Sequence, residues 1–495
     1  MITIVRPATA SAVLMRPTLG RPSASGRGLR TSRYRPFTGP HYCEDMSATT
    51  SRGHVIAWGL WDWASASFNA VITTFVFTVY LTSSSFGDTS ASSTALGWVM
   101  AGAGVVVALL APVTGQRSDR GGRRKLWLAV NTYVVVAMTA LMFFVQPAPE
   151  FLWLGLVLLA VGTVFFEFAS VNYNAMLQQV STPRTIGRVS GFGWGMGYVG
   201  GIVLLLIVYF GFIEPIGGSA LFGVPDTDGL PIRATVLVAA LWYAVFALPV
   251  LLAVPEYHEP SAVASPRIGF LQSYVVLFRD VRALWRERRH TVLFLIASAV
   301  FRDGLTGVFT FGGVLAAGSF GFSSGEVIVF AIAANVVAGI STVLVGLVDD
   351  RVGAKPVMVG SLVGLLLFGM LVFVFHDGGQ TAFWIFGLAL CAFVGPAQSA
   401  SRSFLARQIP EGREGEIFGL YATTGKAATF LTPAMWAVAI SIATAVLPAG
   451  SSTQYWGILG IVLVLLVGLL LLIPVRSPSA DARSRDPLTT ESTPV

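Results

Sequence analysis

The chain has 495 residues, of which 54% are hydrophobic and only 12% are charged, and its mean hydropathy is +0.72. A soluble domain carries about a quarter charged residues, so this composition excludes an ordinary soluble enzyme or binding module and indicates a polytopic membrane protein. The formal net charge of +7 does not indicate nucleic-acid binding, because the basic residues sort by loop.

The first 45 residues contain seven arginines and no acidic residue before Glu44. Such a composition is also found in organellar transit peptides. We instead expect residues 1–52 to be a disordered cytoplasmic tail, or translation to start later than Met1, because the sequence from Met46 reads as a complete N-terminus. A chain that starts at Met46 is therefore expected to insert like the full chain.

Twelve apolar segments follow, each long enough to cross a bilayer as a helix. Their continuous apolar runs favour helices over the alternating strands of a barrel. The segment cores are 56–82, 94–114, 126–145, 151–173, 188–210, 233–254, 291–316, 326–346, 356–375, 381–401, 417–440 and 453–474. We predict an all-α membrane protein with a six-helix half at 53–254, a cytoplasmic central loop at 255–290, a second six-helix half at 291–474 and a disordered cytoplasmic tail at 475–495.

The basic residues predict the orientation. If the N-terminus is cytoplasmic, 29 of the 32 lie on the cytoplasmic side, including Arg402 in a loop expected at 402–413. The opposite side holds Arg233, and Arg302 and Lys426 lie within segments. An excess of Lys and Arg marks cytoplasmic loops, so we expect a multi-pass protein of the cell membrane with both termini in the cytoplasm.

A densely basic stretch recurs in the second half. "GQRSDRGGRRK" at 115–125 and "GLVDDRVGAK" at 346–355 share the pattern G-x-x-x-D-R-x-G at an offset of 231 residues. A second pair of similar stretches begins at Leu177 and Leu405, at an offset of 228. Two features that repeat at nearly one spacing predict two parallel six-helix halves, which is a known transporter plan.

The twelve segments and the doubled motif resemble the major facilitator superfamily. The signature of that superfamily continues with two arginines, as G-x-x-x-D-R-x-G-R-R. The first copy matches every position, and the second departs at its end, where Ala354 and Lys355 replace the two arginines. The stretches "WDWASASFNAVITTFVFTVYL", "NYNAMLQQVSTPRTIGRVSGFGWGMGYVGG" and "GPAQSASRSFLARQIPEGREGEIFGLYATTGK" are similar to the vacuolar-effluxer-like (autophagy-related amino-acid permease) family. Its fungal members export amino acids from the vacuole, so the resemblance implies a transporter, with amino-acid efflux as the expected activity.

Asp119 and Asp350 each end an even-numbered segment on the predicted cytoplasmic side. A carboxylate there can meet the positive N-terminal end of a helix from the opposite half, and the resemblance implies a loop that latches the halves in one state. The glycines are expected to allow tight turns and close backbone approach. The alternative is simple topology anchoring. The predicted latch residues are Gly115, Asp119, Arg120, Gly122, Arg123, Arg124, Gly346, Asp350, Arg351 and Gly353.

A charge at mid-bilayer costs about 2.5–3.5 kcal/mol on insertion scales, so a charged side chain inside a membrane segment indicates a functional role. We therefore predict that the charged and amide side chains within the segments form a substrate or proton pathway. Lys426 lies roughly 15 Å into its helix, near the midplane. Asp303 is its nearest candidate partner, and Glu167 could reach it only across the cavity, in one state. The alternatives are structural ion pairs, snorkelling, and amide bonds between neighbouring helices. The predicted pathway residues are Asp62, Asn69, Glu167, Asn172, Arg302, Asp303 and Lys426, and Asn174 is a further amide.

We therefore predict a monomeric secondary active or facilitative transporter of small solutes that works by alternating access in the lipid bilayer, with proton coupling left open. No cofactor, metal or nucleic acid is expected. "GMGYVG" at 195–200 fits a dinucleotide fingerprint, but it lies inside an apolar segment with no strand before it. The alternatives are a proton-coupled exporter of other small molecules, a membrane-embedded transferase, and a sensor that does not transport.

Overall fold

The computed structural model describes residues 51–87, 89–213, 221–225, 227–256, 270–322, 324–409, 413–448 and 453–476. The predicted tails, except for residues 51–52 and 475–476, and residues 257–269 of the predicted central loop lie outside this part of the chain. Every regular element in the described ranges is helical. Twelve of the described helical spans are long and apolar enough to cross a membrane, which confirms the predicted fold class.

The N-terminal half consists of α1 (Arg52–Ser67), the π-helical η2 (Phe68–Phe75), α2 (Phe77–Leu81), α3 (Thr89–Gly121), α4 (Arg124–Leu141), α5 (Leu152–Ala175), α6 (Ile186–Val208) and α7 (Leu230–Ala253). The C-terminal half consists of α9 (Arg289–Phe320), α10 (Ser324–Val352), α11 (Ala354–Val374), α12 (Gly379–Ala406), α13 (Glu414–Ala428), α14 (Leu431–Val446) and α15 (Gly457–Leu472). Helix α8 (Phe270–Glu287) lies between them in sequence, inside the predicted central loop.

Two of the predicted continuous helices are interrupted. The first span changes from α-helix to π-helix over η2 and continues as α2, and the eleventh span breaks between α13 and α14. Pro433 explains the second break, because its ring would clash with the carbonyl of Thr429 in a continuous helix. Broken or π-helical segments are common at functional sites of membrane proteins.

The two motif turns have the same unusual backbone. Gly122, between α3 and α4, has a φ of 58°, and Gly353, between α10 and α11, has a φ of 90°. A side chain at either position would strain the backbone, so these two glycines permit the turns. The second glycine of the motif therefore has the same conformational role in both copies.

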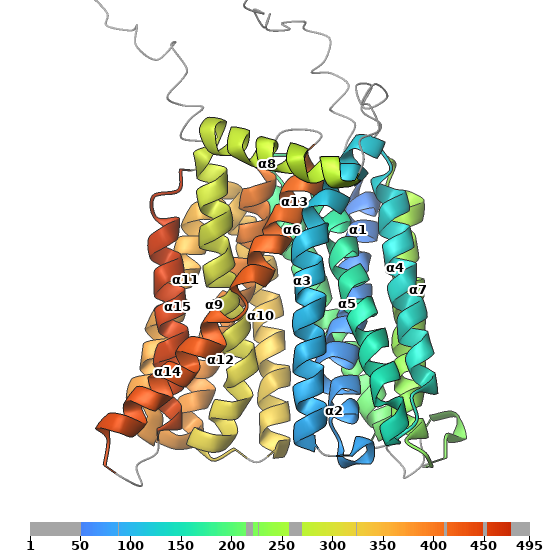
Figure 1. Ribbon diagram of the computed structural model, residues 1–495. Coiled ribbons are helices and arrows are strands. Elements are labelled where there is room, and N and C mark those ends of the chain that lie inside the picture. Colours follow the sequence, from blue (N-terminus) through green and yellow to red (C-terminus); the bar gives the residue numbers. More distant parts are fainter. Residues whose placement is uncertain are drawn as a thin grey trace, which may run out of the picture. The chain divides into compact units, whose positions relative to one another are not determined.

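The halves meet along two seams that the repeat relates to each other. Helix α3 packs on α13, and α6 packs on α10 (Figure 1). Glycines make both seams tight: a methyl group on Gly115 would overlap the carbonyl oxygen of Gly415, and one on Gly346 would lie 3.0 Å from that of Gly187. The first glycine of each motif copy thus allows close approach of two backbones.

We call the end of the bundle that carries both motif turns the basic end. Helix α8 lies across this end in Figure 1. It contacts α9 directly, and the Tyr274 hydroxyl donates a hydrogen bond of 3.1 Å to the carbonyl of Leu109 in α3. Part of the predicted central loop is therefore a helix that touches both halves.

Candidate functional site

The first polar contact between the halves lies where α3 ends. Asp119 accepts hydrogen bonds of 2.9 Å from the backbone N–H groups of Gly415 and Glu416. These groups belong to the first turn of α13, where backbone N–H groups lack partners within the helix and favour a negative charge. Arg124 lies 2.8 Å from Asp119 and 2.5 Å from Glu414. An aspartate of the N-terminal half thus holds the first turn of a helix in the C-terminal half.

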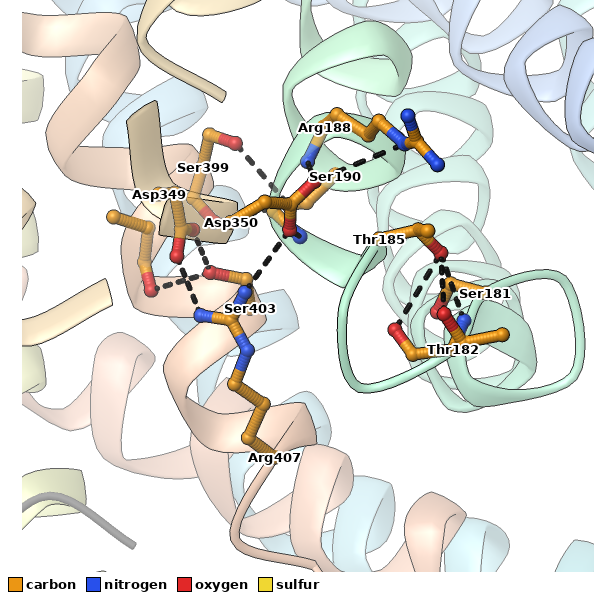
Figure 2. A network of polar contacts seen from close by, with 12 residues as sticks. Ser181, Thr182, Thr185, Arg188, Ser190, Asp349, Asp350, Ser399, Ser403 and Arg407 are labelled. Carbon is orange, nitrogen blue, oxygen red and sulfur yellow. Dashed lines mark hydrogen bonds and ion pairs between the residues drawn. The ribbon is translucent and has the colours of Figure 1, made fainter. Parts of the chain in front are cut away.

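The second seam carries the same contact with the halves exchanged. Asp350, in the last turn of α10, accepts hydrogen bonds of 2.7 Å from the N–H of Gly187 and 3.1 Å from that of Arg188 (Figure 2). Both donors lie in the first turn of α6, in the N-terminal half. The aspartates are 231 residues apart and the glycines 228. The offsets found in the sequence therefore relate two equivalent contacts.

Asp349, next to Asp350 in the sequence, stabilises the C-terminal side of the second seam. Asp349 accepts a hydrogen bond from Ser403 and forms an ion pair with Arg407, which also lies 3.2 Å from Asp350. Figure 2 shows Ser403 of α12 and Arg407, which directly follows α12, beside the two aspartates. All four residues belong to the C-terminal half, so they fix α12 to α10.

The two motif copies contain three further predicted latch arginines, which are Arg120, Arg123 and Arg351. Arg123 and Arg351 are exposed at the basic end, where side chains of this kind can reach lipid phosphates. The side chain of Arg120 lies outside the described part of the structure.

Arg402 corrects the sequence analysis, which places it in a loop at 402–413. It lies inside α12, which continues to Ala406, and only 4% of the residue is exposed. Its guanidinium crosses to the N-terminal half, where Nη1 lies 3.2 Å from Oδ2 of Asp62 and Nη2 donates to the carbonyl of Ser190 at 2.6 Å. In the sequence this arginine marks the end of an apolar segment, whereas in the structure it is the buried centre of a polar cluster.

The N-terminal half surrounds this guanidinium with polar atoms and aromatic rings. We call the surrounding residues the Arg402 cage: Trp58, Asp62, Tyr173, Asn174, Ser190 and Trp194. Nε donates to the Ser190 hydroxyl at 3.0 Å, and Nη1 lies 3.4 Å from the amide oxygen of Asn174. The guanidinium carbon lies 5.0 to 5.9 Å from the three aromatic ring centres, within the distance of a cation–π interaction.

Lys426 pairs with Glu167, the second of its two candidate partners. Its ammonium nitrogen lies 2.7 Å from Oε1 of Glu167, and 30% and 21% of the two side chains are exposed. Because Glu167 belongs to α5, this ion pair joins the two halves. Asp303, the nearest candidate in the sequence analysis, instead accepts a hydrogen bond of 2.6 Å from the backbone N–H of Thr432.

Arg302 and Asp303 lie on either side of the break between α13 and α14. Arg302 stacks on the ring of Tyr421, at 3.8 Å, and donates to the Tyr421 carbonyl at 3.3 Å. Asp303 binds an N–H in the first turn of α14. An anion at the start of a helix matches the dipole of α14, whereas Tyr421 lies in the middle of α13. These contacts stabilise an interrupted helix within one half.

The predicted amide residues separate into two environments. Asn172 is buried, donates to the carbonyl of Phe168 at 2.8 Å and accepts from Ser118 at 2.5 Å. It therefore bonds α3 to α5, which was the alternative to substrate contact. Asn69 is exposed on η2, and its carbonyl accepts from Thr73 and Thr74.

Comparison with known proteins shows which family the chain belongs to. Residues 178–483 match the family model described as "Vacuole effluxer Atg22 like", and residues 16–205 match that of the Major Facilitator Superfamily. The chain belongs to the Atg22-like family of vacuole effluxers, within the Major Facilitator Superfamily. The predicted resemblance is thereby confirmed, and this Atg22-like chain is a multi-pass membrane protein from a superfamily of small-solute transporters.

Two curated relatives span most of the chain. An uncharacterized MFS-type transporter, YxiO of Bacillus subtilis (strain 168), is 27% identical over 422 residues, which are 84% of this chain and 93% of that protein. Autophagy-related protein 22-1 of Phaeosphaeria nodorum is 25% identical over 74% of this chain and 73% of that protein.

Solved structures of the same fold share little sequence with this Atg22-like chain. The proton:xylose symporter XylE has a TM-score of 0.64 at 16% identity, covering 86% of this chain and 96% of its own. A bacterial homologue of the iron transporter ferroportin, in an outward-facing state, has a TM-score of 0.60 at 15% identity, covering 85% and 98%. At this identity the likeness concerns the fold alone.

Proposed function

We propose that this protein exports small solutes, amino acids first among them, by alternating access of its two halves. The observation that carries the proposal is the pair of equivalent contacts in which Asp119 and Asp350 each hold the first turn of a helix in the opposite half. Separation of the halves at the basic end would break both contacts at the same time. Family membership supports a transporter, and the resemblance to amino-acid exporters supports the substrate.

The polar contacts between the halves described above form three layers, starting from the basic end. The two aspartate contacts come first, the Asp62–Arg402 pair follows, and the Lys426–Glu167 pair lies deepest. Gly415 and Lys426 are eleven positions apart in α13, or about 16 Å of helix rise. We infer that the described arrangement is the state closed at the basic end, which the loop charges predict to face the cytoplasm.

A cysteine reporter tests the latch. Thr423 of α13 is partly buried and donates to the carbonyl of Ala108 in α3 across the first seam, so a Thr423→Cys reporter should label more strongly when the seam opens. In a chain with Cys43→Ala and Cys391→Ala, we expect Asp119→Asn or Asp350→Asn to increase labelling. An asparagine cannot replace the second carboxylate oxygen that each pair of N–H groups requires.

The exposed Arg184→Cys gives the labelling of an always accessible site. Unchanged labelling at position 423 in both aspartate variants, with Arg184→Cys reacting normally, would refute the latch. Substrate is tested separately, by release of labelled amino acids from proteoliposomes with and without a pH gradient. No flux of any amino acid would remove the proposed substrate class, and dependence on the gradient would show proton coupling.

A further inference from the structure

Opening of the basic end has a consequence for the Arg402 cage. Every residue of the cage belongs to the N-terminal half, whereas Arg402 belongs to the C-terminal half. If the halves separate there, Arg402 must leave the cage. Its departure would strip Asp62 of its ion pair and Ser190 of the charge-assisted bond at its carbonyl. An uncompensated carboxylate in a poorly solvated site is costly.

The cage does not depend on Arg402 for its own shape. The ring of Tyr173 is stacked between those of Trp58, at 4.4 Å, and Trp61, at 4.2 Å. The indole N–H of Trp58 donates to the Tyr173 carbonyl and that of Trp61 to the Thr132 hydroxyl, both at 3.1 Å. All these contacts lie within the N-terminal half.

The carboxylate of the cage is also oriented by its own half. The Tyr173 hydroxyl donates to Oδ2 of Asp62 at 2.8 Å. Gly193 brings the α6 backbone so close that a methyl group there would lie 2.6 Å from the same oxygen. Asp62 and the rings around it would therefore keep their arrangement after Arg402 has left.

A vacated cage of this kind has the chemistry of a cation site. It contains one carboxylate, three uncharged oxygen acceptors and the faces of aromatic rings. The uncharged acceptors are the amide oxygen of Asn174 and the hydroxyl and carbonyl oxygens of Ser190. Carboxylates and aromatic faces together bind ammonium and guanidinium groups. In the closed state the protein fills this site with a guanidinium of its own, which lies within 3.4 Å of each of the three oxygen-bearing partners.

We propose that the Arg402 cage binds the positively charged ammonium or guanidinium group of the transported solute when the basic end is open, and that Arg402 replaces that group when the end closes. This inference rests on the proposed function, because it requires the halves to separate. It adds the chemical class of the substrate: a solute with a cationic nitrogen group, as every amino acid has. Competition for one site would then link solute release to closure.

Methylguanidinium is the probe, because it carries the group that Arg402 itself places in the cage. Urea is its neutral counterpart of similar shape, and sodium chloride controls for ionic strength. The protein is the full chain with the Thr423→Cys reporter and the Asp119→Asn change, which partly opens the basic end. We expect millimolar methylguanidinium to raise labelling about fivefold or more, the lower limit of usual coupling between two sites, and urea to have no effect.

The matched control is a variant in which the cage has lost its negative charge. Asp62→Asn alone would leave Arg402 buried without its partner, so the variant is Asp62→Asn with Arg402→Gln. In this double variant methylguanidinium should no longer change labelling. The parent here is the Thr423→Cys, Asp119→Asn protein. The cage proposal would be overturned if methylguanidinium changed labelling equally in the parent and the double variant. It would also be overturned if the parent were shown to be open and did not respond, and alternating access would stand in either case.

A second measurement does not require opening. Arg402→Ala leaves the cage with an unpaired Asp62, so methylguanidinium should raise the melting temperature of this variant, whereas urea should not. Arg402→Ala combined with Asp62→Asn should lose the response. If methylguanidinium stabilises both variants equally, the carboxylate does not define a cation site and the proposal fails. If labelling never responds to Asp119→Asn, the latch fails instead, and this stability measurement still decides the cage.

Discussion

At the scale of single residues, the informative side chains are those that reach across the two halves. Arg402 and Lys426 both belong to the C-terminal half, and both form ion pairs with carboxylates of the N-terminal half. Asp303 and Arg302 are also charged residues within a membrane span, but their partners lie within their own half. A charge in a membrane span therefore has a role that depends on which half supplies its partner.

The Lys426–Glu167 pair gives a prediction at this scale. Lys426→Ala should abolish flux and leave Glu167 without a partner, at a cost below the roughly 3–5 kcal/mol of a fully buried pair because both side chains are partly exposed. Lys426→Ala with Glu167→Gln should restore stability but not flux. Flux in proteoliposomes and thermal unfolding measure the two effects.

Other outcomes would assign the pair differently. If the double variant recovers both flux and stability, the pair only joins helices. If Lys426→Ala alone transports normally, Lys426 belongs to packing and not to the pathway.

Sequence alone can identify these charges but not their partners. A charge in an apolar run is visible at once, whereas its partner depends on how helices from distant parts of the chain cross. Arg402 does not stand out in the sequence as a buried residue, because a charge usually ends an apolar segment. The apolar residues Phe404 and Leu405 beyond it are the available signal, together with its repeat equivalent Asn174, 228 residues earlier.

At the scale of helices, the spans follow from the sequence and the interruptions do not. Long apolar runs must form helices in a bilayer because every backbone polar group needs a partner there, so the predicted cores agree with the observed helices. The change to a π-helix in η2 and the break before α14 depend on local contacts. Pro433 is a visible signal for the break, but the side chain that stabilises it, Asp303, lies about 130 residues away.

The break gives the prediction at this scale. Asp303 caps the first turn of α14 through the N–H of Thr432. Asp303→Ala should therefore destabilise the protein by about 0.5–2 kcal/mol, the usual cost of losing a cap. Asp303→Asn keeps one acceptor and should cost less. Thermal unfolding of the two variants and of the unchanged protein measures these differences. Equal stability of Asp303→Ala and the unchanged protein would contradict the role of Asp303 as a cap.

At the scale of the whole molecule, two equivalent seams close one end of the bundle. Asp119 and Asp350 cannot be engaged unless the glycines beside them allow the backbones to meet. In the proposed mechanism, the motif thus combines a contact that holds the closed state with a surface that permits it. Because the repeat relates the seams, damage to either should favour the open state.

The last prediction uses this relation. Gly115→Ala places a methyl group against the Gly415 carbonyl, and Gly346→Ala places one near Gly187 and Gly191. Overpacking of this kind costs about 1–3 kcal/mol, and it acts only on the closed state, so each variant should shift the equilibrium towards the open basic end by about 5- to 150-fold. Labelling of the Thr423→Cys reporter should rise accordingly in both.

Gly104→Ala is the matched control for this experiment, because it lies in the same helix as Gly115 and a methyl group there would meet nothing within 4 Å. It should leave labelling unchanged, and thermal unfolding shows whether each variant remains folded. Since the reporter lies on the α3–α13 seam, a rise caused by Gly346→Ala would mean that opening the α6–α10 seam also opens the other one. If only Gly115→Ala raises labelling, the two seams move independently, and rigid rocking of the halves is wrong.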